Sequence, residues 1–100
     1  MGYSISHGVG STRSALTIAN LGQHLAHTLT GSEWRELSFL FDGRLSDVVH
    51  VPPRQAGRIG DLLEKAAGSR SMNPEWGELA ATLAEAARRA SRAGEDWSWT

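Results

Sequence analysis

The sequence contains no cysteine and no long apolar run. Without cysteine the chain can form no disulfide, no thiolate nucleophile and no cysteine-ligated zinc site. Its apolar stretches fall well short of the ~20 residues that a membrane-spanning helix needs, and its first residues lack the charged and apolar regions of a secretory signal. We therefore expect a cytoplasmic protein with no membrane segment.

An excess of one charge is also missing, since 10 basic residues stand against 11 acidic ones and the formal net charge is -1. Nucleic acids and anionic lipids attract proteins through surplus Lys and Arg, so only a local basic patch would bind them here. Lys65 is the one lysine among the basic residues. This bias toward arginine indicates a GC-rich genome and not a function.

What is present is the composition of an ordinary globular protein, with 40% hydrophobic and 21% charged residues over 100 positions. A chain of this length has room for one domain with one core. It contains no internal repeat, no low-complexity tract and no linker long enough to separate domains. We therefore expect a single α+β domain over residues 1–100.

Apolar residues that recur at three- and four-residue steps predict four amphipathic helices. The first helix begins at about Ser14 and is followed by Gly31. The second begins at Thr30 or Ser32, because Thr30 and Glu33 have the spacing of a capping box. Both helices are expected to bury one apolar stripe each.

The third and fourth helices carry clearer boundary signals. Pro53 near the first helical position starts the third helix, and Gly68 closes it. Asn73 followed by proline starts the fourth helix, which runs to about Ala93 with Gly94 as its C-terminal cap. The many alanines of the fourth helix would let a neighbouring helix approach closely.

Three short strands are predicted between and beside these helices. Tyr3–Ser6 alternates apolar and polar residues, as does Asp96–Thr100 at the other end of the chain. Asp47–Val51 is rich in β-branched residues and lies between the helix stop at Asp42-Gly43 and the break at Pro52-Pro53. We expect one three-stranded sheet with Asp47–Val51 in the centre, covered by the helices.

His24 and His27 are three residues apart on the first predicted helix, so both imidazoles would reach one divalent ion if a third ligand arrived. No third ligand is evident, and His7 and His50 have no companion at ligand spacing. The alternative is that both histidines are solvated or border the core. We predict no bound cofactor.

The segment from His7 to Arg13 joins a predicted strand to a predicted helix. Gly8, Gly10, Ser11, Thr12 and Arg13 are the ingredients of a backbone nest that would bind an anion at a helix N-terminus. The segment lacks both the Lys-Ser/Thr ending of a P-loop and a complete dinucleotide fingerprint. An ordinary connection is the alternative.

Arg88, Arg89 and Arg92, joined by Arg70, would form a basic strip on the last helix that contacts phosphates. The alternative is structural, because basic residues late in a helix complement its dipole and Glu85 is spaced to pair with Arg89.

Trp97 and Trp99 would face the same side of an extended C-terminal segment. Chain ends fray unless they are anchored, and two exposed indoles would be costly in water. Something must therefore cover them. The candidates are the protein's own core, a sister subunit, or a partner protein, since tryptophan is enriched at interface hot spots.

Several segments resemble a group of short uncharacterised proteins of streptomycetes and their phages. They are Met1–Gly8, Glu33–Arg35, Val51–Ile59 and Trp97–Trp99. They are distributed along the chain, so the resemblance extends over most of its length. These motifs are packing and turn signatures, so the resemblance implies a bacterial or phage origin and a cytoplasmic location, and it carries over no functional residue.

No group of nucleophile, base and orienting residue can be assembled from the sequence. The leading hypothesis is therefore a small non-enzymatic protein that binds a partner protein or itself, or that regulates one. Nucleic-acid binding by the arginine-rich last helix is the alternative. A metal- or anion-dependent enzyme using the histidine pair and the glycine-rich segment is a third hypothesis.

Overall fold

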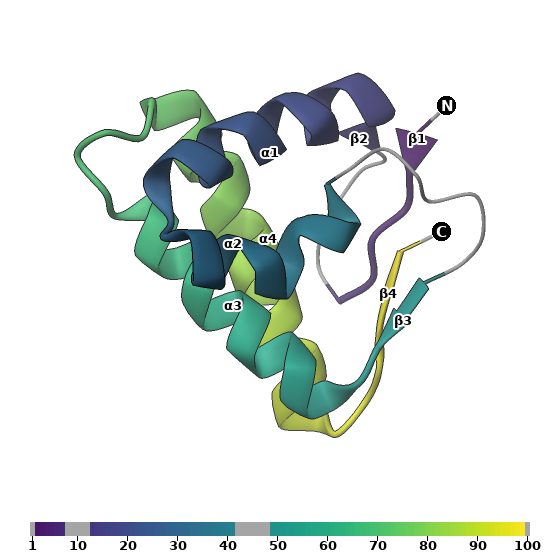
Figure 1. The fold of residues 1–100 in the computed structure, drawn as a ribbon. Helices are drawn as coiled ribbons and strands as arrows, with labels where there is room; N and C mark the ends of the chain where they lie inside the picture. The colour runs from purple at the N-terminus through teal and green to yellow at the C-terminus, as the bar shows by residue number, and fades with distance from the viewer. Residues whose placement is uncertain (1, 8–12, 42–48, 100) are drawn as a thin grey trace.

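The computed structural model describes residues 2–7, 13–41 and 49–99, which form an α+β fold that is mostly helical (Figure 1). The four predicted α-helices are all present in these ranges, together with short strands. In chain order the elements are β1 (Gly2–Tyr3), β2 (Arg13–Ser14), α1 (Ala15–Thr28), α2 (Gly31–Leu37), the 3-10 helix η1 (Ser38–Leu40), β3 (Val49–Val51), α3 (Pro53–Ala67), α4 (Pro74–Ala93) and β4 (Trp97–Trp99).

The helix ends follow their capping signals. At the start of α2 the Thr30 hydroxyl accepts the Glu33 N–H and the Glu33 carboxylate accepts the Thr30 N–H, so the predicted capping box is confirmed. The Asn73 side chain caps α4, and Gly94 ends that helix with a left-handed φ of 69°. The second helix is shorter than predicted, because after Leu37 the chain tightens into η1.

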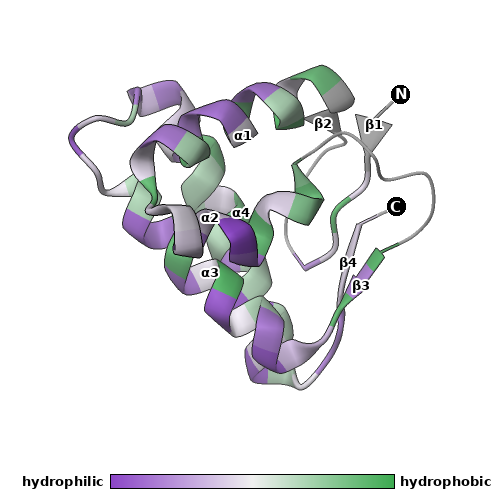
Figure 2. Cartoon of the chain, viewed as in Figure 1, coloured by the Kyte–Doolittle hydropathy of each residue, from purple (hydrophilic) through white to green (hydrophobic). Residues whose placement is uncertain are grey.

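Helices α3 and α4 form an antiparallel pair that is the base of the fold. Gly57 lies opposite Ser91 at one end of the pair, and Gly77 lies opposite Ala67 at the other. At Gly60 an added Cβ would be 3.1 Å from the backbone oxygen of Ala84, so glycine permits the two backbones to approach closely. Figure 2 shows hydrophilic and hydrophobic residues alternating along α3, as amphipathic packing requires.

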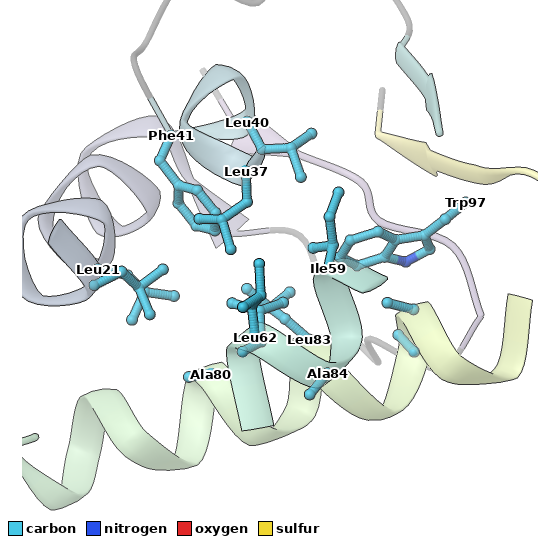
Figure 3. Packing of buried hydrophobic residues seen from close by; sticks show 14 of the residues in the cluster. Leu21, Leu37, Leu40, Phe41, Ile59, Leu62, Ala80, Leu83, Ala84 and Trp97 are labelled. Carbon is cyan, nitrogen blue, oxygen red and sulfur yellow. The ribbon is translucent and has the colours of Figure 1, made fainter. Parts of the chain in front are cut away.

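The core lies between this helix pair and the smaller elements above it. In Figure 3 Leu37 and Phe41 point toward Leu62 and Leu83, and Trp97 lies beside Ile59. These side chains come from both halves of the chain and pack together in one continuous core. Its most buried large members are Ile18, Leu21, Leu25, Leu37, Leu40, Val51, Ile59, Leu63, Leu83, Trp97 and Trp99.

The prediction of one three-stranded sheet is wrong. The strands form two separate antiparallel pairs, β1 with β2 and β3 with β4. In the second pair Val49 is opposite Trp99 and Val51 is opposite Trp97. Ile5 adds a single antiparallel bridge to Trp99. Residues 47 and 48 of the predicted central strand lie outside the described residues.

The order of these segments differs from the prediction for a packing reason. β4 lies between Ile5 and β3, so the C-terminal segment is central and Val49–Val51 is at its edge. Both tryptophans of β4 are buried, whereas His50 in the middle of β3 is exposed. The strand with more apolar surface to cover thus takes the more enclosed position.

None of the helices in the described ranges has the length and apolar character to cross a membrane.

Candidate functional site

The outward side of α1 carries no formal charge. The whole helix lacks Asp, Glu, Lys and Arg. Its inner stripe, Ile18, Leu21 and Leu25, is buried, and the residues on the opposite side are Leu16, Asn20, Gln23 and His27. We refer to these four outward residues as the α1 face.

Leu16 is the most unusual member of the α1 face. Its side chain is 71% exposed, and it is the only exposed large hydrophobic residue in the part of the chain that the structure describes. Gln23 and His27 are also exposed, and Asn20 is half-buried. The α1 face is therefore an accessible strip of apolar, amide and imidazole groups that follows the helix for most of its length.

The other helix surfaces are charged, and several of their charges are paired with one another. Lys65 of α3 donates to Glu33 of α2 at 2.6 Å, and Arg58 makes a two-bond contact with Glu36 at 2.9 and 3.0 Å. The hydrogen bond from Arg58 lowers the pKa of Glu36 below its usual value. These pairs hold α2 against α3 and offer little uncompensated charge to a ligand.

The predicted arginine strip is largely engaged by carboxylates. Arg88 pairs with Asp61 at 2.8 Å and also with Glu64, and the bond to Asp61 raises the pKa of Arg88. Arg89 pairs with Glu85, as the four-residue spacing predicts. Arg92 is exposed near the end of α4. Within the described part of the chain, neither Arg92 nor Arg70 forms an ion pair. Ion pairing therefore does not join either residue to this strip.

Two hollows lie along the same α3–α4 surface and share Arg88 and Arg92. The larger has a volume of about 370 Å³ and the smaller about 290 Å³. Asp61 lines the first, while Glu64 and Glu85 line the second. A bound phosphate would meet these carboxylates as well as the arginines, which disfavours an anion site at this surface.

His24 and His27 do not share an environment. The His24 ring stacks on Trp76 of α4, with ring centroids 5.1 Å apart and an interplanar angle of 28°. His27 is exposed on the α1 face. Within the described ranges no three metal-ligating side chains lie together, so the third ligand that a metal site needs is not found there.

The predicted anion nest falls mostly on residues that the structure does not describe. Gly8, Gly10, Ser11 and Thr12 lie outside the described residues. Arg13 is in β2, where its backbone is paired with Tyr3.

Trp97 and Trp99 are covered by the chain itself. Their exposed fractions are 0% and 1%, and their rings meet edge to face at 5.4 Å. The Trp97 ring nitrogen donates to the Ser6 carbonyl at 3.2 Å, and Phe41 packs edge to face on Trp99 at 5.8 Å. The own-core alternative is the one found, and neither indole is accessible to a partner in this fold.

One polar group was not anticipated from the sequence. The Ser6 hydroxyl contacts His7 Nδ1 at 2.6 Å, and His7 Nε2 contacts the Glu95 carboxylate at 3.1 Å. Ser6 Oγ also accepts the Ser98 N–H at 2.9 Å, which leaves its own proton for His7. Hydroxyl, imidazole and carboxylate thus stand in one row, in which both the Ser6 hydroxyl and the His7 ring are occupied by contacts within the fold.

This row joins the two ends of the chain. His7 adopts a left-handed φ of 66°, which turns its ring toward Glu95. None of the three residues lines either of the two hollows on α3–α4. No sequence signal could have found the row, since Glu95 follows His7 by 88 positions and only the tertiary fold brings them together.

Comparison with known proteins places the chain in a family. A family model described as a domain of unknown function, DUF7739, matches residues 5–100. The chain belongs to the DUF7739 family. No curated protein matches it, and no solved structure matches it either.

The DUF7739 match covers every element discussed above except β1. Both the α1 face and the Ser6–His7–Glu95 row therefore fall within the family region. The family description assigns no activity, so a function for this DUF7739 domain has to be argued from its surfaces.

Proposed function

We propose that this protein is a small, non-enzymatic binding or regulatory protein of bacterial or phage origin that works in the cytoplasm. In this proposal the α1 face is the surface that binds another protein. The observation that carries it is an exposed helix face with no charged residue and with Leu16 71% exposed.

The composition of the α1 face supports this role. The centres of protein–protein interfaces are depleted of charged residues, and their polar groups form hydrogen bonds across the contact. Leu16 would supply apolar contact, and Asn20 and Gln23 would each supply both donors and an acceptor. A partner with an uncharged, partly apolar surface fits this face, because no buried charge would be left unpaired.

Nucleic-acid binding by α4 is the weaker alternative. Arg88 and Arg89 are each within hydrogen-bond distance of a carboxylate, so phosphate contact would require breaking existing ion pairs. The net charge of -1 adds no long-range attraction.

The proposal is tested by affinity capture with a tagged protein and two variants that each add one carboxylate to an exposed helix position. Leu16→Glu changes the α1 face, and Gln55→Glu changes α3. We expect one protein to be retained in stoichiometric amount by the wild type and by Gln55→Glu, and to be lost with Leu16→Glu. Thermal unfolding of all three proteins checks that the fold is kept.

Retention that is the same for all three proteins would contradict the proposal, since binding would then not involve the α1 face. Retention of nothing by the wild type, in extracts of the organism that encodes the protein, would contradict it as well, unless the purified chain associates with itself and Leu16→Glu abolishes that association. The retained protein would be identified by mass, with an untagged copy of the chain itself included in the extract.

A further inference from the structure

We propose that the occupant of the α1 face is a second copy of this chain, bound through an antiparallel pairing of two α1 helices. This inference rests on the proposed function, because it names the partner of the same surface. It makes the protein a reversible homodimer whose subunits are related by a twofold axis that passes through the middle of α1.

The first argument concerns charge. Among the described α-helices, α1 is the only one without a charged residue, whereas α2, α3 and α4 all carry acidic and basic side chains. A charged surface docked on the α1 face would lose water without gaining a counter-charge there. The surface of this protein that matches an uncharged helix is therefore another α1.

The second argument concerns spacing. A twofold contact must be self-complementary. If one residue of the first copy contacts a second residue of the other copy, then that second residue in the first copy contacts the first residue in the other. The α1 face meets this condition when the axis passes between positions 21 and 22. Leu16 then lies opposite His27 of the second copy, and Asn20 lies opposite Gln23 of the second copy.

These opposed groups are chemically compatible. The Asn20 and Gln23 amides can each donate and accept, so two reciprocal hydrogen bonds form beside the axis. Leu16 packs on the flat imidazole of His27, which offers an apolar body with a polar edge. The contact leaves no formal charge buried while His27 is neutral.

The size of the contact predicts its strength. A helix of 14 residues is about 21 Å long. A single helix–helix contact of that length buries on the order of 500 Å² in total, below the ~1,200 Å² of stable interfaces. The dimer is thus expected to be weak and concentration-dependent, with a dissociation constant of about 0.1–1 mM.

Sedimentation equilibrium of the purified protein tests the inference, from about 10 µM to about 2 mM, a range that brackets the expected constant. The mean mass should rise from the 10.8 kDa of one chain toward twice that value. Gln23→Glu places like charges near the axis and should keep the mass at that of one chain throughout. Gln55→Glu, the same change on α3, should leave the rise intact.

The absence of cysteine allows a second test of the register. Chains carrying Leu16→Cys are mixed with chains carrying His27→Cys at high concentration and then oxidised. The antiparallel register predicts that the mixed disulfide forms faster than either symmetric disulfide. Equal rates for all three pairings would overturn the proposed register.

A mass that stays at one chain for the wild type up to the highest concentration would overturn the second-copy proposal. So would a rise in mass that Gln23→Glu does not affect. Either result leaves the proposed function open, because loss of a different protein with Leu16→Glu in the capture experiment would still support it. Failure of the capture experiment alone would not remove a dimer seen by sedimentation.

Discussion

Glu33 joins two elements through a single side chain. One carboxylate oxygen accepts the Thr30 N–H at 3.0 Å and closes the capping box of α2, and the other accepts from Lys65 of α3 at 2.6 Å. The hydrogen bond from Lys65, followed by that from Thr30, lowers the pKa of Glu33 from 4.5 to about 2. The ionised form is thus the one that the fold favours.

Acidification should weaken this contribution within a defined range. Because the folded-state pKa is lowered, the stabilisation is complete above about pH 4.5 and is lost as the pH falls toward about 2. Glu33→Gln keeps a capping side chain but removes the charge. Its deficit in the free energy of unfolding, measured in urea, should therefore shrink over this range.

Glu78→Gln is the matched control for that experiment. Glu78 is exposed on α4, and its carboxylate forms no ion pair within the described part of the chain. Its difference from the wild type should stay nearly constant with pH. A constant deficit for Glu33→Gln would mean that the Lys65 contact does not stabilise the fold.

Two glycines allow the same substitution to be tested with opposite expected effects. A Cβ on Gly22 of α1 would be 2.7 Å from the Phe41 Cβ, whereas a Cβ on Gly31 at the start of α2 would meet nothing within 4 Å. Gly22→Ala should lower the free energy of unfolding by about 1–3 kcal/mol through overpacking. Gly31→Ala should raise it by about 0.4–1 kcal/mol by reducing the entropy of the unfolded chain.

Chemical denaturation of the two glycine variants measures both changes. Equal effects of the two substitutions would show that the close approach of α1 to Phe41 is not a tight contact.

At the scale of elements, β4 contributes more to the core than its three residues suggest. Its two indoles are buried against each other and against Phe41, and its backbone contacts both Ile5 and β3. By comparison, Trp76 of α4 is only half-buried and stacks on His24. Trp97, which is buried, and Trp76, which is half-buried, thus provide a matched pair for mutation.

Trp97→Ala should lower the free energy of unfolding by about 3–5 kcal/mol, because it leaves a large cavity next to Ile59. Trp76→Ala should lower it by about 1–2 kcal/mol, since part of that ring already contacts water. Thermal and urea unfolding followed by circular dichroism compare them. A larger loss for Trp76→Ala would contradict the central position of β4.

Elements that depend on local signals were predictable from the sequence. The four helices, the Thr30 capping box and the Gly94 cap all follow from residues within one or two turns. The sheet was not predictable in the same way, because the partners of β4 are 46 to 50 positions away in β3 and 94 positions away at Ile5. Short strands carry too little pattern to choose between such distant partners.

The same distinction applies to the candidate surfaces. The Glu85–Arg89 pair follows from helical spacing, but the contacts of Arg88 with Asp61 and Glu64 come from another helix and could not be predicted. The charge-free composition of α1 can be read in the sequence. Which of its sides faces outward also follows from periodicity, but the exposure of Leu16 required the packed structure.

Considered as a whole molecule, the protein has little electrostatic attraction for nucleic acid. The net charge is -1, and two of the three arginines of the predicted strip are paired with carboxylates. We expect binding of a labelled DNA duplex no tighter than ~10⁻⁴ M at about 0.15 M salt, measured by fluorescence anisotropy. Replacing Arg88, Arg89 and Arg92 together with alanine should change little.

The opposite result would favour the nucleic-acid alternative. It would consist of tighter binding that falls steeply with added salt and is lost in the triple variant. The Glu33 and glycine variants would not be expected to alter such binding, so they serve as controls for a general loss of folded protein.

The contacts of Ser6 with the Trp97 indole and the Ser98 backbone also bear on how the molecule is made. A ribosome releases β4 after the helices against which it packs, so a nascent chain holds α1 to α4 before it holds the two indoles that close the core. Ile5 and β3 must wait for the same strand. The core therefore closes only after β4 has emerged from the ribosome, and until then its apolar interior depends on whatever shields it in the cell.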